Sequence, residues 1–223
     1  MRPPISYSEV VRVAELEREA PGSERAAVSD AAPSTASRLT SGLVELATTA
    51  ILAIVIYLVV QTFVVQTYRV EMQSMVPSLD DGQHLLIDKL TPRFDDYSRG
   101  DVVVFQPPGS RRDETPFIKR VIGTAGDHVE ISGGGVVVNG VRLEEGYVAS
   151  DGPTVPSCGD SAWNVPVGEI FVLGDHRSAS RDSRCFGTVR VGNVIGRAWV
   201  RFWPLDGLSI LPTPTYAGVP PAG

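Results

Sequence analysis

The strongest constraint on this chain is a run of 23 residues without a charge, from Leu46 to Tyr68, LATTAILAIVIYLVVQTFVVQTY. As an α-helix rising about 1.5 Å per residue, it would extend about 34 Å, enough to cross the hydrocarbon core of a bilayer. A cleavable secretory signal would be shorter and follow a basic leader, whereas about 40 mostly polar residues come first here. Apolar side chains on every face argue against a buried core helix. The run therefore predicts an uncleaved membrane anchor.

The rest of the chain divides around this anchor. Residues 1–42 have too little apolar periodicity to form a core and are predicted to be mostly disordered. Residues 43–68 hold the anchor, residues 69–211 a β-rich domain, and residues 212–223, rich in Pro and Gly, a flexible tail. The few charges that flank the run do not decide by the positive-inside rule which end faces the cytoplasm.

The segment after the anchor has the pattern of β structure. Short runs rich in Val, Ile and Phe alternate with Gly and Asp, as is typical of strands joined by turns. Asn139-Gly140 can supply the positive φ angles of a tight hairpin turn. No stretch here shows a sustained helical period, so we expect an all-β domain of antiparallel sheets behind one N-terminal transmembrane helix. The expected strands are residues 101–105, 117–122, 129–131, 136–138, 169–173 and 194–202.

Length and charge limit the class of protein. A chain of 223 residues, of which 43% are hydrophobic, supplies roughly one globular domain with appendages. The formal net charge is −6, without the basic footprint of a nucleic-acid-binding protein. We therefore expect no nucleic-acid partner.

One lysine stands out in the expected strand at 117–122. Because side chains alternate along a strand, Lys119 shares a face with Phe117 and Val121. Burial among apolar neighbours disfavours the charged ammonium and lowers its pKa, which allows a lysine to act as a general base near neutral pH. Taken alone, a lysine in a strand is more often exposed at a sheet edge.

Four sequence boxes resemble those of the bacterial type I signal peptidases, the S26 serine endopeptidases with a Ser-Lys dyad. They are SMVPSL at 74–79, RGDVVVF at 99–105, FIKRVIGTAGD at 117–127 and LGDHRSASRDSR at 173–184. They occur in the family's order behind an anchor. The resemblance implies a cytoplasmic N-terminus and a β-domain outside the cell. It also implies secretory preproteins as substrates, with membrane lipid and the secretion translocon nearby.

The resemblance implies a role for each matching residue. Ser74 would be the nucleophile and Lys119 the base that activates it, without cofactor or metal. Ser180 would hydrogen-bond Lys119 and hold it toward Ser74. Two ion pairs would brace the final box, or would be ordinary structural salt bridges: Asp182 with Arg184, and Asp175 with Arg177.

The chain departs from many family members two residues before the nucleophile. There a serine hydroxyl often joins the nucleophile's N–H in the oxyanion hole, but here the residue is Met72, which cannot donate. Other branches have glycine, so activity is not excluded. The substrate would add as a strand beside this segment, with Met72, Gln73 and Met75 forming one wall. Shallow pockets there would accept Ala-x-Ala sites.

The two cysteines, Cys158 and Cys185, lie 27 residues apart without a Cys-x-x-Cys motif or a histidine at metal spacing, so we expect no zinc site. In an extracytoplasmic domain they could form a disulfide, or they could remain two buried thiols. The aromatic residues Trp199, Phe202 and Trp203 lie near the domain's end, where they could contact the lipid interface or pack in the core.

Other functions are weighed against this one. A Ser-His-Asp triad built on His84, His128 or His176 lacks the Gly-x-Ser-x-Gly motif around Ser74, and His176 is taken as structural. A silent relative that binds signal sequences should lack the nucleophile or the base. A self-cleaving repressor-type protease should have a DNA-binding domain instead of an anchor. A peptidase dedicated to one substrate class, such as pilins, stays open.

Overall fold

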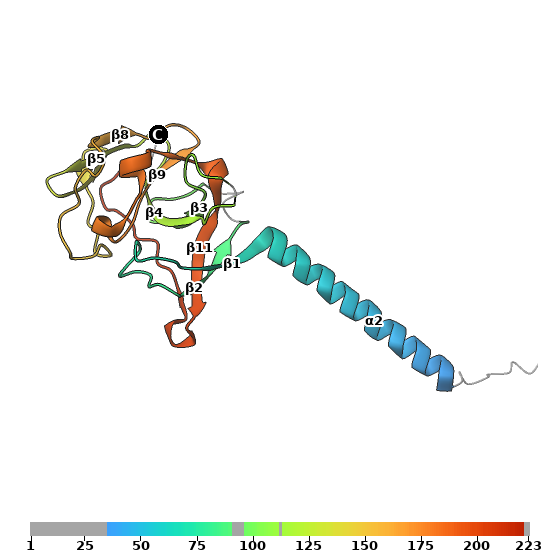
Figure 1. Cartoon of the computed structure of the whole chain (residues 1–223). Helices are drawn as coiled ribbons and strands as arrows, with labels where there is room; N and C mark the ends of the chain where they lie inside the picture. Colours follow the sequence, from blue (N-terminus) through green and yellow to red (C-terminus); the bar gives the residue numbers. More distant parts are fainter. Residues whose placement is uncertain (1–34, 91–95, 112, 221–223) are drawn as a thin grey trace, which may run out of the picture. The chain divides into compact units, whose positions relative to one another are not determined.

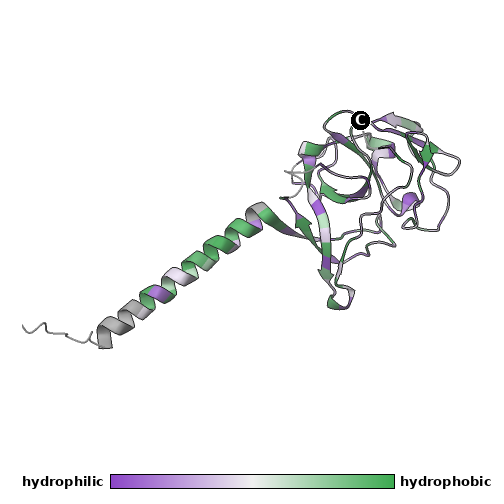
Figure 2. Ribbon diagram, turned by 180° about the vertical axis from the view of Figure 1, so that it is seen from behind, coloured by the Kyte–Doolittle hydropathy of each residue, from purple (hydrophilic) through white to green (hydrophobic). Residues whose placement is uncertain are grey.

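The computed structural model describes residues 35–90, 96–111 and 113–220. Of residues 1–42, predicted to be mostly disordered, residues 1–34 lie outside the described part, and residues 35–42 are helical instead. Helix α2 (Thr35–Val59) is followed by a π-helical turn, η1 (Val60–Val64). Within α2, residues 42–59 are long and apolar enough to cross a membrane, the one such stretch in the described residues. Figure 2 shows the helix covered largely by hydrophobic residues. In length and composition this helix fits the predicted anchor.

The C-terminal end of the anchor is corrected by the structure. Residues Val65–Arg69 form strand β1, which pairs antiparallel with β2 (His84–Asp88), so that Val65 lies opposite Asp88. An uncharged run rich in β-branched residues is compatible with a strand as well as with a helix. The absence of charge up to Tyr68 therefore placed the predicted end of the anchor too late in the sequence. The last residues of the run therefore belong to the β-domain.

The all-β prediction is confirmed, with every strand pairing antiparallel. The larger sheet has the order β1-β2-β11-β3-β4-β9-β10, with β12 beside β11; the smaller has the order β7-β6-β5-β8 (Figure 1). Beyond β1 and β2, the larger sheet contains β3 (Val102–Phe105), β4 (Phe117–Gly123), β9 (Glu169–Leu173), β10 (Val189–Arg190), β11 (Val194–Trp203) and β12 (Ser209–Ile210). The smaller contains β5 (His128–Ser132), β6 (Gly135–Val138), β7 (Val141–Arg142) and β8 (Ala162–Asn164).

Short turns complete the domain. A four-residue helix, α3 (Ser183–Phe186), follows the 3₁₀ turn η3 (Arg177–Ala179), and two further 3₁₀ turns are η4 (Val191–Asn193) and η5 (Leu205–Gly207). The predicted hairpin turn is present, because Asn139 and Gly140 have φ angles of 51° and 80° between the paired residues Val138 and Val141. Both positive angles are those that such a turn requires.

Strand β4 is central to the site because it lies between β3 and β9 and is buried on both faces. Val103 lies opposite Lys119, and Val121 opposite Val172. All residues of β4 after Phe117 are buried. Lys119, the third residue of this strand, is therefore buried within the sheet.

The expected flexible tail packs against the domain over its described part, residues 212–220. Thr213 Oγ1 donates to Asp101 Oδ1 at 3.0 Å, and the hydroxyls of Tyr216 and Tyr147 lie 2.6 Å apart. Tyr216 and Val219 also pack on the apolar core beneath the small sheet. Proline and glycine prevent regular structure here, but the tyrosine and valine side chains still bury apolar surface.

Candidate active site

Ser74 follows β1 in a segment that is held by buried side chains. Met75 and Leu79 are completely buried in a core cluster with Leu85 and Ile87, and Leu79 N–H donates to Met75 O at 2.9 Å. The expectation that Met75 lines the substrate wall is therefore corrected, because its side chain faces the core. Its burial instead fixes the backbone next to Ser74.

Lys119 and Ser74 are in direct contact. Lys119 Nζ lies 2.8 Å from Ser74 Oγ and donates to Ile118 O at 2.9 Å. The exposed fractions of the two residues are 3% for Lys119 and 6% for Ser74. The Nζ atom also lies 5.3 Å from the centre of the Phe117 ring. The nucleophile and the base predicted from the boxes are thus brought together in a nearly dry setting.

Burial lowers the pKa of Lys119 to about 8, because the enclosed site disfavours the charged ammonium. The negative charges of Asp182 and Asp175 act in the opposite direction and raise this pKa. Both carboxylates are already paired with arginines, Asp182 with Arg184 and Asp175 with Arg120. The result is an amine that is neutral in a substantial fraction of molecules at mildly alkaline pH, as a general base must be.

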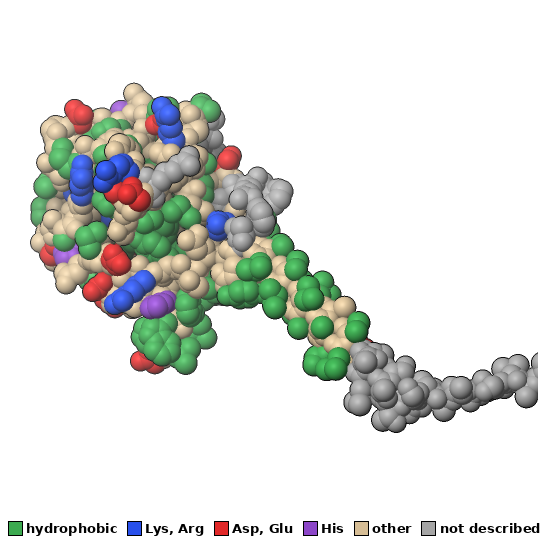
Figure 3. Space-filling model, turned by 45° about the vertical axis from the view of Figure 1, so that its right-hand side comes forward, with side chains coloured by type: hydrophobic (Ala, Val, Ile, Leu, Met, Phe, Trp, Pro, Cys, Tyr) green, Lys and Arg blue, Asp and Glu red, His purple; other side chains and the backbone are tan. Residues whose placement is uncertain are grey.

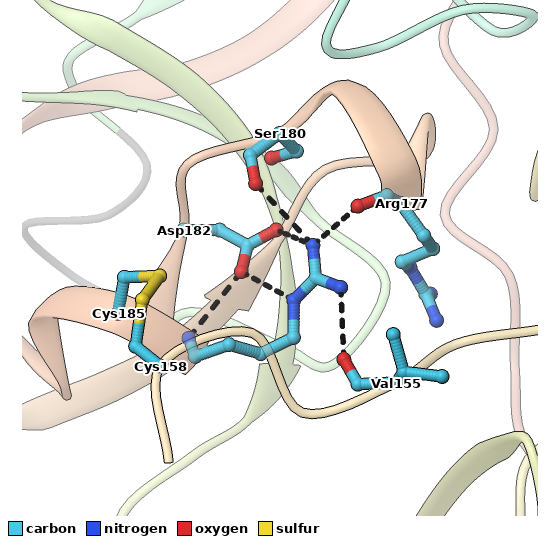
Figure 4. Close-up of a disulfide and its surroundings, with 7 residues drawn as sticks. Val155, Cys158, Arg177, Ser180, Asp182 and Cys185 are labelled. Atoms are coloured by element: carbon cyan, nitrogen blue, oxygen red, sulfur yellow. Dashed lines mark hydrogen bonds and ion pairs between the residues drawn. A yellow bond between two sulfur atoms is a disulfide. The ribbon is translucent and has the colours of Figure 1, made fainter. Parts of the chain in front are cut away.

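The predicted pair of Asp182 and Arg184 is present. Arg184 Nε and Nη2 each donate to the carboxylate at 2.8 Å, and Gly174 N–H donates to Asp182 Oδ2 at 3.1 Å. The Arg184 guanidinium also donates to Arg177 O at 2.6 Å and to Val155 O at 3.2 Å. Figure 4 shows Arg177 and Val155 to the right of Asp182. Through these hydrogen bonds, Arg184 connects residues within the final box and links the box to the loop around residue 155.

The expected pair of Asp175 and Arg177 is not formed. Asp175 accepts two hydrogen bonds from Arg120, at 2.9 and 2.6 Å, while Arg177 donates to Glu145 at 3.1 and 2.6 Å. Arg177 is the first residue of the turn at residues 177–179, and each of the two side chains finds a partner from another element. Both acids and both arginines are buried or nearly so, which makes the pairing costly to break.

Arg120 is the residue that sequence reasoning missed most clearly. Beyond Asp175, its guanidinium donates to Gly100 O at 2.8 Å and Ser78 Oγ at 3.3 Å, and it lies 4.1 Å from the centre of the Tyr147 ring. One side chain thus contacts all three of the other sequence boxes. Its place beside Lys119 in a buried strand was a signal, because an arginine there needs several partners.

The structure does not form the expected hydrogen bond between Ser180 and Lys119. Ser180 Oγ is buried and has no hydrogen-bond partner within the described residues, since Lys119 Nζ is directed to Ser74 and Ile118. Ser180 nevertheless lies close to the nucleophile. A Cβ placed on Gly174 would lie 2.3 Å from Ser180 Oγ and 2.6 Å from Ser74 O, so Gly174 lets these two residues approach one another.

Met72 lies in the left-handed region, with φ of 77°, and its side chain is 60% exposed. Its N–H donates to Asp81 Oδ1 at 3.2 Å. Gln73 is also exposed, so Met72 and Gln73 remain on the open side of the nucleophile segment. The left-handed backbone is the conformation that glycine adopts without strain, in keeping with glycine as an alternative here.

Cys158 and Cys185 are joined in a disulfide, which Figure 4 shows beside Asp182. The bond connects the loop around residue 155 to α3. The described residues contain no group of three or more metal-ligating side chains that could hold an ion. No cofactor enters the chemistry proposed below.

The three histidines make other contacts. His84 stacks edge-on to Phe202, with ring centres 5.8 Å apart, and His128 Nδ1 lies 2.7 Å from Asn164 Oδ1. The His176 ring contacts Gln73 O and Asp151. The side chain that contacts Ser74 Oγ is Lys119, so nothing favours a Ser-His-Asp triad in the described residues.

Residues 43–203, more than half of the chain, match the family model described as Signal peptidase, peptidase S26. The chain belongs to this family. It is therefore a serine peptidase, a hydrolase. The S26 match includes all four sequence boxes and both members of the Ser74–Lys119 contact.

Named relatives agree with this assignment. The signal peptidase I of Leptolyngbya laminosa is 40% identical over 153 residues, which cover 65% of this chain and 72% of that protein. The probable signal peptidase I-2 of a Synechocystis strain is 37% identical over 170 residues, which cover 75% of this chain and 76% of that protein. A crystal structure of a signal peptidase I from Enterococcus faecalis is 32% identical, with a TM-score of 0.38, and its alignment covers 46% of this chain and 97% of that one.

Proposed function

We propose that this S26 peptidase removes N-terminal signal peptides from exported preproteins with a Ser74–Lys119 dyad, cleaving after Ala-x-Ala-like sites. The observation that carries the proposal is the 2.8 Å contact between Lys119 Nζ and Ser74 Oγ in a buried setting. The lowered pKa of Lys119, about 8, supports the role of a neutral amine as base. The names of the relatives support the choice of substrate class.

The chemistry follows from this contact. Neutral Lys119 accepts the Ser74 hydroxyl proton while Oγ attacks the scissile carbonyl carbon, and the carbonyl oxygen becomes an oxyanion. The leaving amine takes the proton from Lys119 as the peptide C–N bond breaks, which leaves an acyl-enzyme ester on Ser74. Lys119 then deprotonates a water that attacks the ester carbonyl carbon. As the bond from this carbon to Ser74 Oγ breaks, Lys119 returns the proton to Oγ, which releases the product and restores the dyad. Ser74 N–H serves as one oxyanion donor, and the second donor is unassigned because residue 72 is Met.

Position at the membrane is part of the proposed function. Residues 42–59 would anchor the enzyme, with the N-terminus in the cytoplasm and the β-domain outside, near the translocon. A nucleophile that follows an anchor closely is restricted to the layer where the signal peptide's cleavage site emerges, which raises its effective concentration there. The substrate would add as a strand beside the exposed backbone at Met72 and Gln73.

An apolar patch offers a second contact with lipid. Trp199 and Trp203 are about half exposed, and Leu205, Leu208 and Ile210 are more exposed still. Figure 3 shows hydrophobic side chains gathered at one tip of the domain. We propose that these β11–β12 residues lie in the lipid interface, where tryptophan is favoured. Quenching of tryptophan fluorescence by brominated lipid in vesicles should be strong for wild type and weaker for Trp203→Ala.

The experiment for the proposed function is cleavage of a preprotein with an Ala-x-Ala site by the full-length enzyme in detergent. We expect wild type to cut after the second Ala, as read by mass spectrometry of both products, and Ser74→Ala to leave the preprotein intact. A matched preprotein with a bulky residue at either Ala position should resist cleavage. Wild type that cleaves neither preprotein would favour a catalytically impaired homologue, whereas cutting confined to pilin-type precursors would favour a dedicated processing peptidase.

A further inference from the structure

His176 contacts the backbone on both sides of the nucleophile. Its ring Nδ1 lies 3.1 Å from Gln73 O, and its backbone N–H donates to Ser74 O at 3.1 Å. The other ring nitrogen, Nε2, lies 2.9 Å from Asp151 Oδ2. The side chain is 19% exposed, so most of the ring is enclosed between the nucleophile segment and the loop that carries Asp151.

The chemistry of these partners defines the role of the ring nitrogens. A carbonyl oxygen and a carboxylate oxygen both accept hydrogen bonds, so a ring N–H is the group that can bind either of them. Asp151 is the charged partner of the ring. The neighbouring Asp175 and Arg177 are committed elsewhere, to Arg120 and Glu145.

The peptide unit that receives this hydrogen bond also contains the proposed oxyanion donor. Gln73 C=O and Ser74 N–H belong to one trans peptide, so they point in opposite directions. A ring N–H donor at the oxygen fixes the orientation of this plane and polarises it, which strengthens the Ser74 N–H as a donor. Val76 N–H also donates to Gln73 O, at 3.2 Å, so the ring adds a second donor to a carbonyl that the turn already holds.

We propose that His176, held by Asp151, is a positioning residue that orients and polarises the Gln73–Ser74 peptide for oxyanion binding. This inference rests on the proposed function, because it assigns a task to the Ser74 N–H of that mechanism. The contact would strengthen the Ser74 N–H as an oxyanion donor in a chain where residue 72, a methionine, has no hydroxyl to serve as a second donor. Its effect acts in the transition state, where the oxyanion exists.

The test uses the full-length enzyme in detergent with a peptide substrate that contains an Ala-x-Ala site. His176→Ala should lower kcat about 10-fold and leave KM within twofold of wild type. The expected loss is smaller than the about 100-fold loss of kcat that removal of an oxyanion donor causes, because the variant only weakens the Ser74 N–H as a donor. His176→Gln, which keeps a neutral N–H, should recover part of that loss. His128→Ala is the matched control, because His128 contacts Asn164 in the small sheet.

A second readout separates oxyanion binding from general structure. A peptide aldehyde ending in Ala-x-alaninal adds Ser74 Oγ to its carbon. The C=O π bond becomes a C–O⁻ single bond in the oxyanion position, and the serine proton passes to Lys119. The matching alaninol peptide forms no such bond. His176→Ala should weaken aldehyde binding about 10-fold and leave alcohol binding within twofold.

Each outcome is decisive. Loss of kcat and of aldehyde affinity, with the thermal midpoint and alcohol binding unchanged, supports the inference. Equal loss of aldehyde and alcohol binding, a kcat within twofold of wild type, or a loss that follows a lowered thermal midpoint overturns it. Wild type that neither cleaves the peptide nor binds the aldehyde overturns the proposed function as well, which distinguishes the two failures.

Discussion

Gly174→Ala should impair the enzyme by displacing the nucleophile. The added Cβ would lie 2.3 Å from Ser180 Oγ and 2.6 Å from Ser74 O, although real Cβ contacts are essentially never shorter than 3.0 Å. The Ser180 hydroxyl must therefore retreat by about 0.7 Å and the Ser74 carbonyl by about 0.4 Å. Since a misplacement of about 1 Å can cost about 100-fold in rate, we expect kcat/KM to fall about 10- to 100-fold.

The assay is steady-state cleavage of an Ala-x-Ala peptide, together with thermal unfolding. The overpacking should also cost about 1–3 kcal/mol of unfolding free energy. Gly146→Ala is the matched control, because a Cβ at Gly146 meets no atom within 4 Å, so its activity should be unchanged. A Gly174→Ala enzyme within twofold of wild type in kcat/KM would refute the claim that this close approach positions Ser74.

Three further predictions follow from the site. Because only neutral Lys119 can accept the Ser74 proton, kcat/KM should fall about 10-fold per pH unit below about 8 and level off above it; a flat profile from pH 6 to 9 would contradict this role. Arg120→Met should lower the urea unfolding free energy by about 3–5 kcal/mol, because it leaves Asp175 buried without its partner; a loss below 1 kcal/mol would refute the buried pair's importance. Met72→Gly should stabilise the protein by about 1 kcal/mol in the same measurement, since glycine relieves the left-handed backbone; destabilisation would show that the Met72 side chain packs productively.

The parts of the fold that the sequence predicts are those with a strong local pattern. The strands β3, β4, β9 and β11 each carry a run of β-branched or aromatic residues, and the Asn139-Gly140 turn has its own conformational preference. The two-residue strands β7, β10 and β12 are too short for any periodicity. All of β1 except Arg69 lies inside the uncharged run, where the hydropathy of a strand and of a membrane helix are alike.

The site divides in the same way. The resemblance brings Ser74 and Lys119 together, and strand alternation places Lys119 among apolar neighbours, as the structure has it. The partners of the charged residues depend instead on tertiary packing. Asp175 pairs across 55 positions with Arg120, and Arg177 across 32 positions with Glu145, whereas sequence proximity favoured a local pair that does not form. Asp182 and Arg184, two residues apart, are the one local pair of the predicted two that is present.

The central claim is that neutral Lys119 takes the proton of Ser74, and the most direct measurement is the cleavage rate of Lys119→Arg. Arginine keeps a positive charge of similar length but stays protonated at any working pH, so it cannot act as the base. The account predicts at least a 100-fold loss of kcat/KM from pH 7 to 9, equal to that of Lys119→Ala, with the thermal midpoint retained. A Lys119→Arg enzyme that cleaves at the wild-type rate would contradict the dyad.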